Sequence, residues 1–154
     1  MKKLLFLTTF LFISFSCKSQ YDSIHSSSLK INGRTYLGKS ESFLLSHFGK
    51  PSSKEIFFFE MDNIKGYKYT YNKITFYVSK GKINSFEITG DRYTFINSKI
   101  KIGSNISALK ELFPDSYKNR SYQNGITITL SDIDKFIVFE WDYFKIEKIS
   151  VYDF

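Results

Sequence analysis

Cysteine, proline and histidine are scarce in this chain of 154 residues. Cys17 is the single cysteine, so no disulfide can form within the chain. The two prolines are Pro51 and Pro114, and the two histidines are His25 and His47. The sequence therefore contains no His or Cys spacing typical of a metal site, and it also lacks a phosphate-binding glycine loop and a Gly-x-Ser-x-Gly motif.

The sequence has no apolar run long enough to span a bilayer in a mature protein. Its main apolar run, Leu4 to Phe15, follows Lys2 and Lys3 and leads to Ser16 and Cys17. A short apolar run behind basic residues is typical of an export signal. We therefore predict a signal peptide over residues 1–16.

Cys17 follows that run directly, and this arrangement resembles the lipobox of bacterial lipoproteins. Ser16 fits the small residue before the cysteine, whereas Ser14 and Phe15 depart from the usual pattern. The resemblance implies that Cys17 is acylated and becomes the mature N-terminus. It implies a lipid-anchored protein of the cell envelope, at the outer membrane and facing the periplasm. The alternative is an ordinary secretory signal with an unrelated cysteine.

Residues 18–28 are polar and rich in serine, which is typical of a flexible tether. With Cys17 they form a predicted segment 17–28 between membrane and domain. The formal net charge of the whole chain is +7, and without Lys2 and Lys3 it is about +5, because 20 basic residues then face 15 acidic ones. This excess favours anionic partners or lipid headgroups, although a solvated lysine-rich surface is the simpler interpretation. We predict no nucleic-acid partner.

A short capped helix is predicted between Ser40 and Gly49. The Ser40 hydroxyl is suited to the helix start, and Glu41 in the first turn is favoured by the helix dipole. Gly49 is suited to the left-handed residue that ends a helix, and Pro51 prevents its continuation. A weaker copy of this pattern recurs 65 residues later, from Gly103 to Pro114.

The echo extends beyond the helix and predicts the fold. Apolar residues of the later segments correspond at an offset of 63, and the last strand of each copy changes phase in the same way, which predicts a bulge or bend at the same place. Alternation predicts strands at Ile56–Glu60, Tyr67–Tyr71, Ile74–Val78, Ile83–Thr89, Ile126–Leu130, Phe136–Trp141 and Ile146–Tyr152. We predict the α+β class with two tandem repeats, 29–89 and 90–154. In each repeat a short helix packs on an antiparallel β-meander.

These residues carry a family resemblance. The pattern Gly38-x-Ser40, Leu44, Phe48-Gly49-x-Pro51, followed by Phe76-x4-Gly81-x-Ile83-x2-Phe86, resembles the SmpA/OmlA-type lipoproteins of the β-barrel assembly machinery. Two such units in tandem are similar to the β-lactamase inhibitor protein architecture. The resemblance implies a non-enzymatic protein that binds other proteins or lipid at the envelope. It supplies no contact residues that match positions in this chain.

Catalysis would require a convergent set of acid, base or nucleophile groups, and the sequence does not supply one. His47 is expected at a helix C-terminus, where the dipole favours it. Turn chemistry explains the pairs Asp132/Asp134 and Glu60/Asp62 more simply than calcium binding. We predict no enzyme activity, no cofactor and no metal.

Aromatic residues are the best binding candidates. Tyr67, Tyr69 and Tyr71 alternate along one strand and so share a sheet face, and Tyr77 is expected on the face that the helix leaves uncovered. Trp141 is the matching residue of the second copy. Exposed, these rings would form an amphipathic contact surface; the alternative is that they pack under the helix or between the units.

We therefore expect an exported, lipid-anchored, non-enzymatic module. It would recognise an envelope protein or component, of unknown identity, through an open sheet face. The alternative is a structural or sensing lipoprotein that holds a small apolar ligand between helix and sheet. An apolar cavity would favour this alternative.

Overall fold

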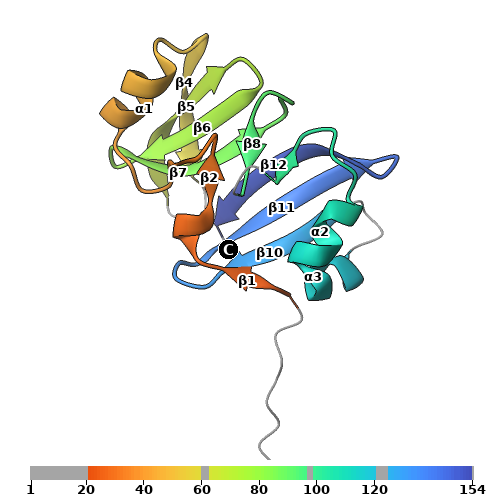
Figure 1. The fold of residues 1–154 in the computed structure, drawn as a ribbon. Coiled ribbons are helices and arrows are strands. Elements are labelled where there is room, and N and C mark those ends of the chain that lie inside the picture. Colours follow the sequence, from red (N-terminus) through yellow and green to blue (C-terminus); the bar gives the residue numbers. More distant parts are fainter. Residues whose placement is uncertain (1–20, 60–62, 97–98, 121–124, 154) are drawn as a thin grey trace, which may run out of the picture.

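The computed structural model describes residues 21–59, 63–96, 99–120 and 125–153 (Figure 1). Long strands and short helices make up this part of the chain. In order they are β1 (Ser23–Ile24), the 3-10 turn η1 (Ser26–Ser28), β2 (Lys30–Ile31), β3 (Arg34–Thr35), α1 (Glu41–Phe48), β4 (Ser53–Phe59), β5 (Ile64–Tyr71), β6 (Ile74–Ser79), β7 (Lys82–Ile88), β8 (Thr94–Phe95), β9 (Ile100–Lys101), α2 (Ser107–Leu112), α3 (Pro114–Lys118), β10 (Gly125–Leu130), β11 (Lys135–Asp142) and β12 (Lys145–Asp153).

Within the described residues the strands form two sheets. The large one has eight strands in the order β1-β10-β11-β12-β7-β6-β5-β4, and the small one has four in the order β3-β2-β8-β9. All neighbours in the large sheet are antiparallel except β1 and β10, which are parallel. The large sheet is therefore mixed and includes strands from both halves of the sequence.

The predicted fold class, two tandem α+β repeats with a helix on each meander, is wrong. One mixed sheet of eight described strands runs through both halves, because β7 of the first half pairs with β12 of the second. The first strands of the two halves also pair with one another, since β2 meets β8 through Ile31 and Phe95. Periodicity identifies strands but not which edges meet, and open edges satisfy their backbone groups by pairing.

The predicted helix at Ser40–Gly49 is confirmed as α1. The Ser40 side chain accepts a hydrogen bond from the Phe43 N–H at 3.2 Å. Gly49 follows the helix with a φ of 72°, and its N–H donates to the Leu45 carbonyl at 2.9 Å. Leu44 is fully buried, and Phe43 and Phe48 of this short helix also pack against the core.

The second helical segment differs from its prediction. Asn105 accepts from the Ser107 N–H at 2.9 Å, so a side-chain acceptor does stand at the start of α2. Helix α2 does end before Pro114, at Leu112, but Pro114 then opens a further helix, α3, that was not predicted. Proline fits the first turn of a helix, where its missing N–H has no intrahelical acceptor.

The sequence echo has a counterpart in the backbone hydrogen bonds. The Gly38 N–H donates to the Ile83 carbonyl at 2.8 Å, and the Gly103 N–H donates to the Ile146 carbonyl at 2.7 Å. In each half, this bond ties the chain before the helix to the last strand of a hairpin. The two halves thus share local geometry even though they do not form separate units.

The predicted bulges are confirmed. The β6–β7 register shifts between Tyr77 and Val78, and the β11–β12 register shifts between Glu140 and Trp141. Both shifts leave one extra residue in the later strand, Asn84 and Glu147, which differ by the offset of 63. The change of phase in the sequence thus reflects a bulge at the same place in both hairpins.

The halves join through equivalent residues. Glu87 of β7 pairs with Ser150 of β12, the residue that corresponds to Glu87 in the second half at the offset of 63. On either side, Phe86 pairs with Val151 and Ile88 pairs with Ile149. A local twofold axis that passes between Glu87 and Ser150 would relate the two strands in this antiparallel pairing. The first half meets the second edge to edge, as two copies of one strand would.

One aromatic core runs under both halves. Phe76 contacts Phe86 with ring centroids 6.1 Å apart, Phe86 contacts Phe95 at 5.9 Å, and Phe95 contacts Phe139 at 6.1 Å. All four rings are fully buried. Burying each such ring contributes about 1.5–3 kcal/mol, so the small sheet, which supplies Phe95, holds the two halves together from one side.

The structure places part of the predicted tether in the fold. Asp22 and Ser116 exchange two hydrogen bonds of 2.8 Å, Asp22 N–H to Ser116 Oγ and Ser116 N–H to Asp22 Oδ2. Farther on, β1 pairs with β10, and Asp132 accepts hydrogen bonds from the backbone and hydroxyl of Ser26. The predicted signal peptide 1–16 and the anchor Cys17 lie outside the described residues.

Candidate binding surface

The two faces of the large sheet differ in what covers them. Ring contacts place α1 on the face of Phe76, because Phe48 lies 5.0 Å from it. The residue after α2, Phe113, lies 6.4 Å from Phe139, a residue of the same face. Helices α1, α2 and α3 and the small sheet therefore cover the core face (Figure 1). None of the described elements covers the opposite face, which we call the open face.

The open face can be followed across the strands by register. Paired residues share a face, so each row crosses the sheet. One row from β4 to β10 is Ser53, Thr70, Thr75, Glu87, Ser150, Val138 and Thr127. A second comprises Glu55, Lys68, Tyr77 and Ser85 in the first half and Tyr152, Phe136 and Thr129 in the second.

Glu87 lies at the centre of the open face between two tyrosines. The Tyr152 hydroxyl donates to the Glu87 carboxylate at 3.4 Å. Burial, followed by the negative charge of Glu87 and a hydrogen bond to it, raises the pKa of Tyr77 well above its ordinary value. Both tyrosines therefore lie against one carboxylate, and this arrangement combines a charge with two aromatic rings.

An ion pair lies beside this centre. The Lys148 ammonium lies 2.6 Å from the Glu140 carboxylate. The hydrogen bond to Glu140 raises the pKa of Lys148, and the negative charges of Glu140 and Glu87 act in the same direction. The open face thus carries positioned charges of both signs.

Aromatic rings extend from the centre in both directions. Phe57 lies 4.8 Å from Tyr77, and Phe136 lies 5.8 Å from Tyr152. All four side chains are partly exposed. Rings that already pack against one another lose little rotamer freedom when a partner covers them.

One polar atom at the centre has no partner. Ser150 is fully buried, and its hydroxyl makes no hydrogen bond among the described residues. Ser85 on the neighbouring strand is also buried. Small residues at the join of the halves thus lie beneath larger neighbours, so Glu87 and its tyrosines form the contact layer.

The predicted tyrosines divide between the two faces. Tyr69 and Tyr71 are 1% and 7% exposed and belong to the core under α1. The Tyr69 hydroxyl donates to Glu41, and burial raises the pKa of Tyr71 to about 12. Tyr67 remains 43% exposed beside the Lys54 ammonium, which lies 4.2 Å from its ring centroid. Packing under the helix therefore describes Tyr69 and Tyr71, whereas Tyr77 lies on the open face.

Trp141 lies near the end of the β11–β12 hairpin. It packs partly against the core and stacks on Phe144, with ring centroids 5.9 Å apart and an interplanar angle of 15°. Its indole N–H is buried and has no hydrogen-bond partner in the described part of the chain. The structure does not bring Trp141 together with the predicted tyrosines.

The remaining sequence candidates have structural roles. The His47 ring contacts the Phe43 carbonyl, with Nδ1 2.8 Å from its oxygen, at the last turn of α1. Asp132 accepts the two Ser26 hydrogen bonds, which are the main causes of its lowered pKa. Glu60 and Asp62 lie outside the described residues. Among the residues that the structure describes, no three His, Cys, Asp or Glu side chains gather as a metal site would require.

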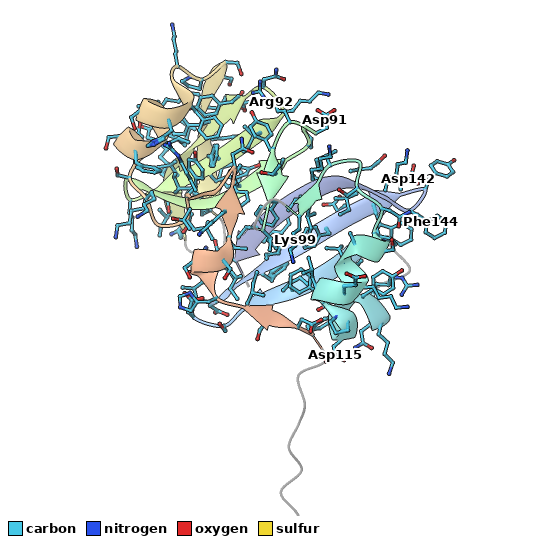
Figure 2. The ribbon with its side chains drawn as sticks, in the orientation of Figure 1. Asp91, Arg92, Lys99, Asp115, Asp142 and Phe144 are labelled. Carbon is cyan, nitrogen blue, oxygen red and sulfur yellow. The ribbon has the colours of Figure 1, made fainter. Side chains whose placement is uncertain are left out.

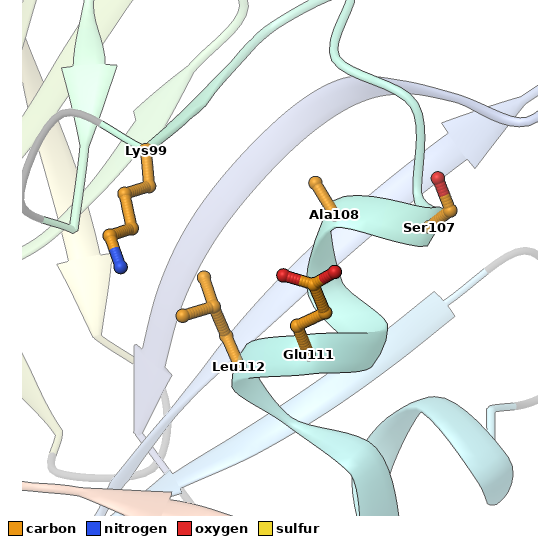
Figure 3. A pocket seen from close by; sticks show the side chains of 5 residues that line it. All are labelled: Lys99, Ser107, Ala108, Glu111 and Leu112. Carbon is orange, nitrogen blue, oxygen red and sulfur yellow. The ribbon is translucent and has the colours of Figure 1, made fainter.

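A hollow lies between α2 and the loop before β9 (Figure 3). It measures about 310 Å³; α2 supplies Ser107, Ala108, Glu111 and Leu112, and Lys99 extends toward them. The lining is more polar than apolar, and two of its residues are charged. It is not the apolar cavity that a small apolar ligand would require.

Sequence reasoning missed Glu87, Tyr152, Phe136 and Lys148. Each occupies the polar or outward phase of a strand that was predicted correctly. The available signal was the correspondence of Glu87 with Ser150, which marks the join of the halves. Without knowledge of which strands pair, this correspondence could not indicate a surface.

Comparisons with known proteins give a fold similarity only. No protein-family model matches the chain, and no curated protein does. A solved structure, an extracellular protein containing a SCP domain from Bacillus anthracis str. Ames, is similar with a TM-score of 0.50 and 15% identity. The match covers 76% of this chain and 44% of that one, so this chain spans less than half of the other protein. In the part of the chain that is described, no helix is long and apolar enough to cross a membrane.

Proposed function

We propose that the protein is an exported, lipid-anchored, non-enzymatic binding module of the cell envelope. Its open face recognises a partner protein, and Cys17 carries the anchor. The observation that supports this proposal is the uncovered centre of the sheet, where Tyr77 and Tyr152 flank Glu87.

This centre has the composition of a protein contact surface. Tyrosine offers a large apolar ring with a polar tip, and such residues contribute most to binding energy where they are packed at the middle of an interface. Here Glu87 and the Lys148–Glu140 pair supply charges close to the rings. Charges in fixed positions favour one partner orientation and oppose others.

Export and anchoring are supported by the sequence before the fold. Lys2, Lys3 and the apolar run precede Cys17, and the similar solved structure belongs to an extracellular protein. The resemblance to SmpA/OmlA-type lipoproteins supports a non-enzymatic role at the envelope, with the outer membrane and the periplasm as the proposed location.

A small-ligand function has less support. The space between α1 and the sheet is filled by Leu44, Phe76 and Tyr69, each almost fully buried. The hollow beside α2 is polar. The hollow beside α2 is therefore not the apolar cavity that would favour this alternative over a binding surface.

A matched pair of charge reversals tests the open face. Glu87→Lys changes the centre of the open face, whereas Glu111→Lys makes the same chemical change on the exposed side of α2. We expect Glu87→Lys to lose the partner that wild-type protein captures by crosslinking in cells, and Glu111→Lys to retain it. Equal capture by both variants, with unchanged thermal unfolding, would contradict the proposal.

A further inference from the structure

The turn of the β11–β12 hairpin has an unusual composition. Tyr143 and Phe144 have φ values of 43° and 63°. A two-residue turn with positive φ at both positions usually contains asparagine or glycine, because a β-carbon there costs about 1–2 kcal/mol per residue. Two bulky aromatic residues in this conformation are backbone outliers, and such outliers cluster at functional sites.

The other half of the molecule provides an internal comparison. The β6–β7 hairpin has Lys80 and Gly81 at the corresponding positions, with φ values of 49° and 71°. Both turns lie beside equivalent bulges, and the turn residues and the bulge residues of the two hairpins differ in number by the same 63. The same backbone can therefore be made without aromatic side chains, so the fold alone does not require Tyr143 or Phe144.

Both aromatic side chains of this turn are directed outward. Tyr143 is 88% exposed and Phe144 is 63% exposed, the first of these being the most exposed of the large apolar side chains described. Figure 2 shows Asp142 and Phe144 at the outer edge of the molecule. Isolated exposed rings are common, but here two adjacent rings are backed by a third, since Trp141 stacks on Phe144.

The turn is held in place. The Phe144 carbonyl accepts a hydrogen bond from the Ile106 N–H at 2.9 Å, and the backbones of Asn105 and Lys145 form an isolated antiparallel β-bridge. The start of α2 therefore fixes the hairpin end from one side. A ring presented on a fixed turn is ordered before binding, which lowers the entropic cost of inserting it.

The direction of the N-terminal strand relates this turn to Cys17, the proposed lipid anchor. Strand β1 runs parallel to β10, with Ser23 beside Thr129, so Asp22, which precedes the strand, lies toward the Gly125 end of β10. Gly125 pairs with Glu140, three residues before Tyr143. The turn is thus about 23 Å from Ser23 along the strand direction. Six residues separate Cys17 from Ser23 and span at most about 20 Å when extended, so Cys17 can reach nearly the same level as the turn.

We propose that Tyr143 and Phe144, backed by Trp141, insert into the interfacial layer of a phospholipid bilayer. That layer takes amphipathic aromatic rings, and Cys17 lies only six residues before Ser23, so this contact rests in part on the proposed lipid anchor at Cys17. This is a second contact, beyond the proposed protein partner of the open face. It would fix the orientation of the domain relative to the membrane.

The chain contains its own probe for this contact, because Trp141 is the single tryptophan. The experiment uses the full chain, reconstituted into vesicles of phosphatidylethanolamine and phosphatidylglycerol and isolated by flotation. Tryptophan emission is compared between ordinary vesicles and vesicles whose acyl chains are brominated near the headgroup. The control is Tyr143→Lys with Phe144→Gly, which gives this turn the residues of the β6–β7 turn.

We expect wild-type protein to lose emission in brominated vesicles and the control variant to lose much less. Equal loss in both, or no loss in wild type, would overturn the proposal. Failure here would leave the open-face proposal untouched, since the vesicles contain no partner protein.

Discussion

The β6–β7 and β11–β12 turns have similar backbone conformations, but their residues differ in the backbone strain that this conformation causes. Gly81 has a φ of 71°, and an added β-carbon would meet no heavy atom within 4 Å. Phe144 adopts a φ of 63° with a full side chain. The strain at Phe144 is therefore intrinsic to its backbone, offset in part by its stacking on Trp141.

This comparison predicts effects of different size for two substitutions. Gly81→Ala should lower the free energy of unfolding by about 1–2 kcal/mol, from backbone strain alone. Phe144→Gly should change it by less than about 1 kcal/mol, because relief of strain offsets a lost ring stack of about 0.5–1.5 kcal/mol. Urea unfolding measures both. A larger loss for Phe144→Gly than for Gly81→Ala would show that the aromatic turn is structural.

Glu41 provides a pH dependence at the same scale. A hydrogen bond from Tyr69, and then the neighbouring Lys54, hold the pKa of Glu41 below its ordinary value of 4.5. A lowered folded pKa contributes stability that is present above the ordinary value and is lost as the pH falls through the folded pKa.

Removing the Tyr69 hydroxyl tests this linkage. Tyr69→Phe should cost about 1 kcal/mol at neutral pH, and the gap to wild type should close as the pH falls below about 4. Urea unfolding of both proteins between pH 3 and pH 7 checks this, because the range includes the ordinary pKa of glutamate. If the difference in unfolding free energy between the two proteins were the same at pH 3 and pH 7, the hydrogen bond from Tyr69 to Glu41 would not be the cause of that difference.

At the scale of elements, the N-terminal strand and α3 depend on one another. Pro114 opens α3, and the Ser116 N–H in its first turn is satisfied by Asp22, 94 residues earlier. The Asp22 N–H in turn donates to the Ser116 hydroxyl. A five-residue helix is marginal alone, so this remote cap supports it.

Substitutions at Asp22 should separate capping from charge. Asp22→Ala should lower the free energy of unfolding by about 1–2 kcal/mol, whereas Asp22→Asn keeps an acceptor oxygen and should lower it by a few tenths. Amide hydrogen exchange should also accelerate at Thr129 and Ser131, whose N–H groups donate to Asp22 and Ile24. Unchanged exchange in the alanine variant would show that β1 is held without this cap.

Local elements could be predicted from the sequence because their causes are local. Ser40, Gly49 and Pro51 fixed the bounds of α1, and alternation located β4–β7 and β10–β12. The α3 helix and β1 were missed, since α3 begins at a residue expected to end a helix and β1 depends on a contact 94 residues away.

At the scale of the whole molecule, strand pairing decided what the sequence could not. The repeat pattern was compatible with separate units and with one shared sheet, and only the β7–β12 pairing distinguishes them. That pairing also moves Glu87 from a strand near an edge to the middle of the open face. The candidate site could therefore be predicted only as aromatic and sheet-borne, with Tyr77 as the one predicted residue near its centre.

The central claim is that the open face binds a protein, and position-resolved photocrosslinking in cells tests it most directly. A photoreactive phenylalanine analogue is placed at Tyr77 or Phe136 on the open face and at Leu45 on the exposed side of α1. We expect one adduct of the same mass from both open-face positions and none from Leu45. An adduct from Leu45 with none from Tyr77 or Phe136 would contradict the account.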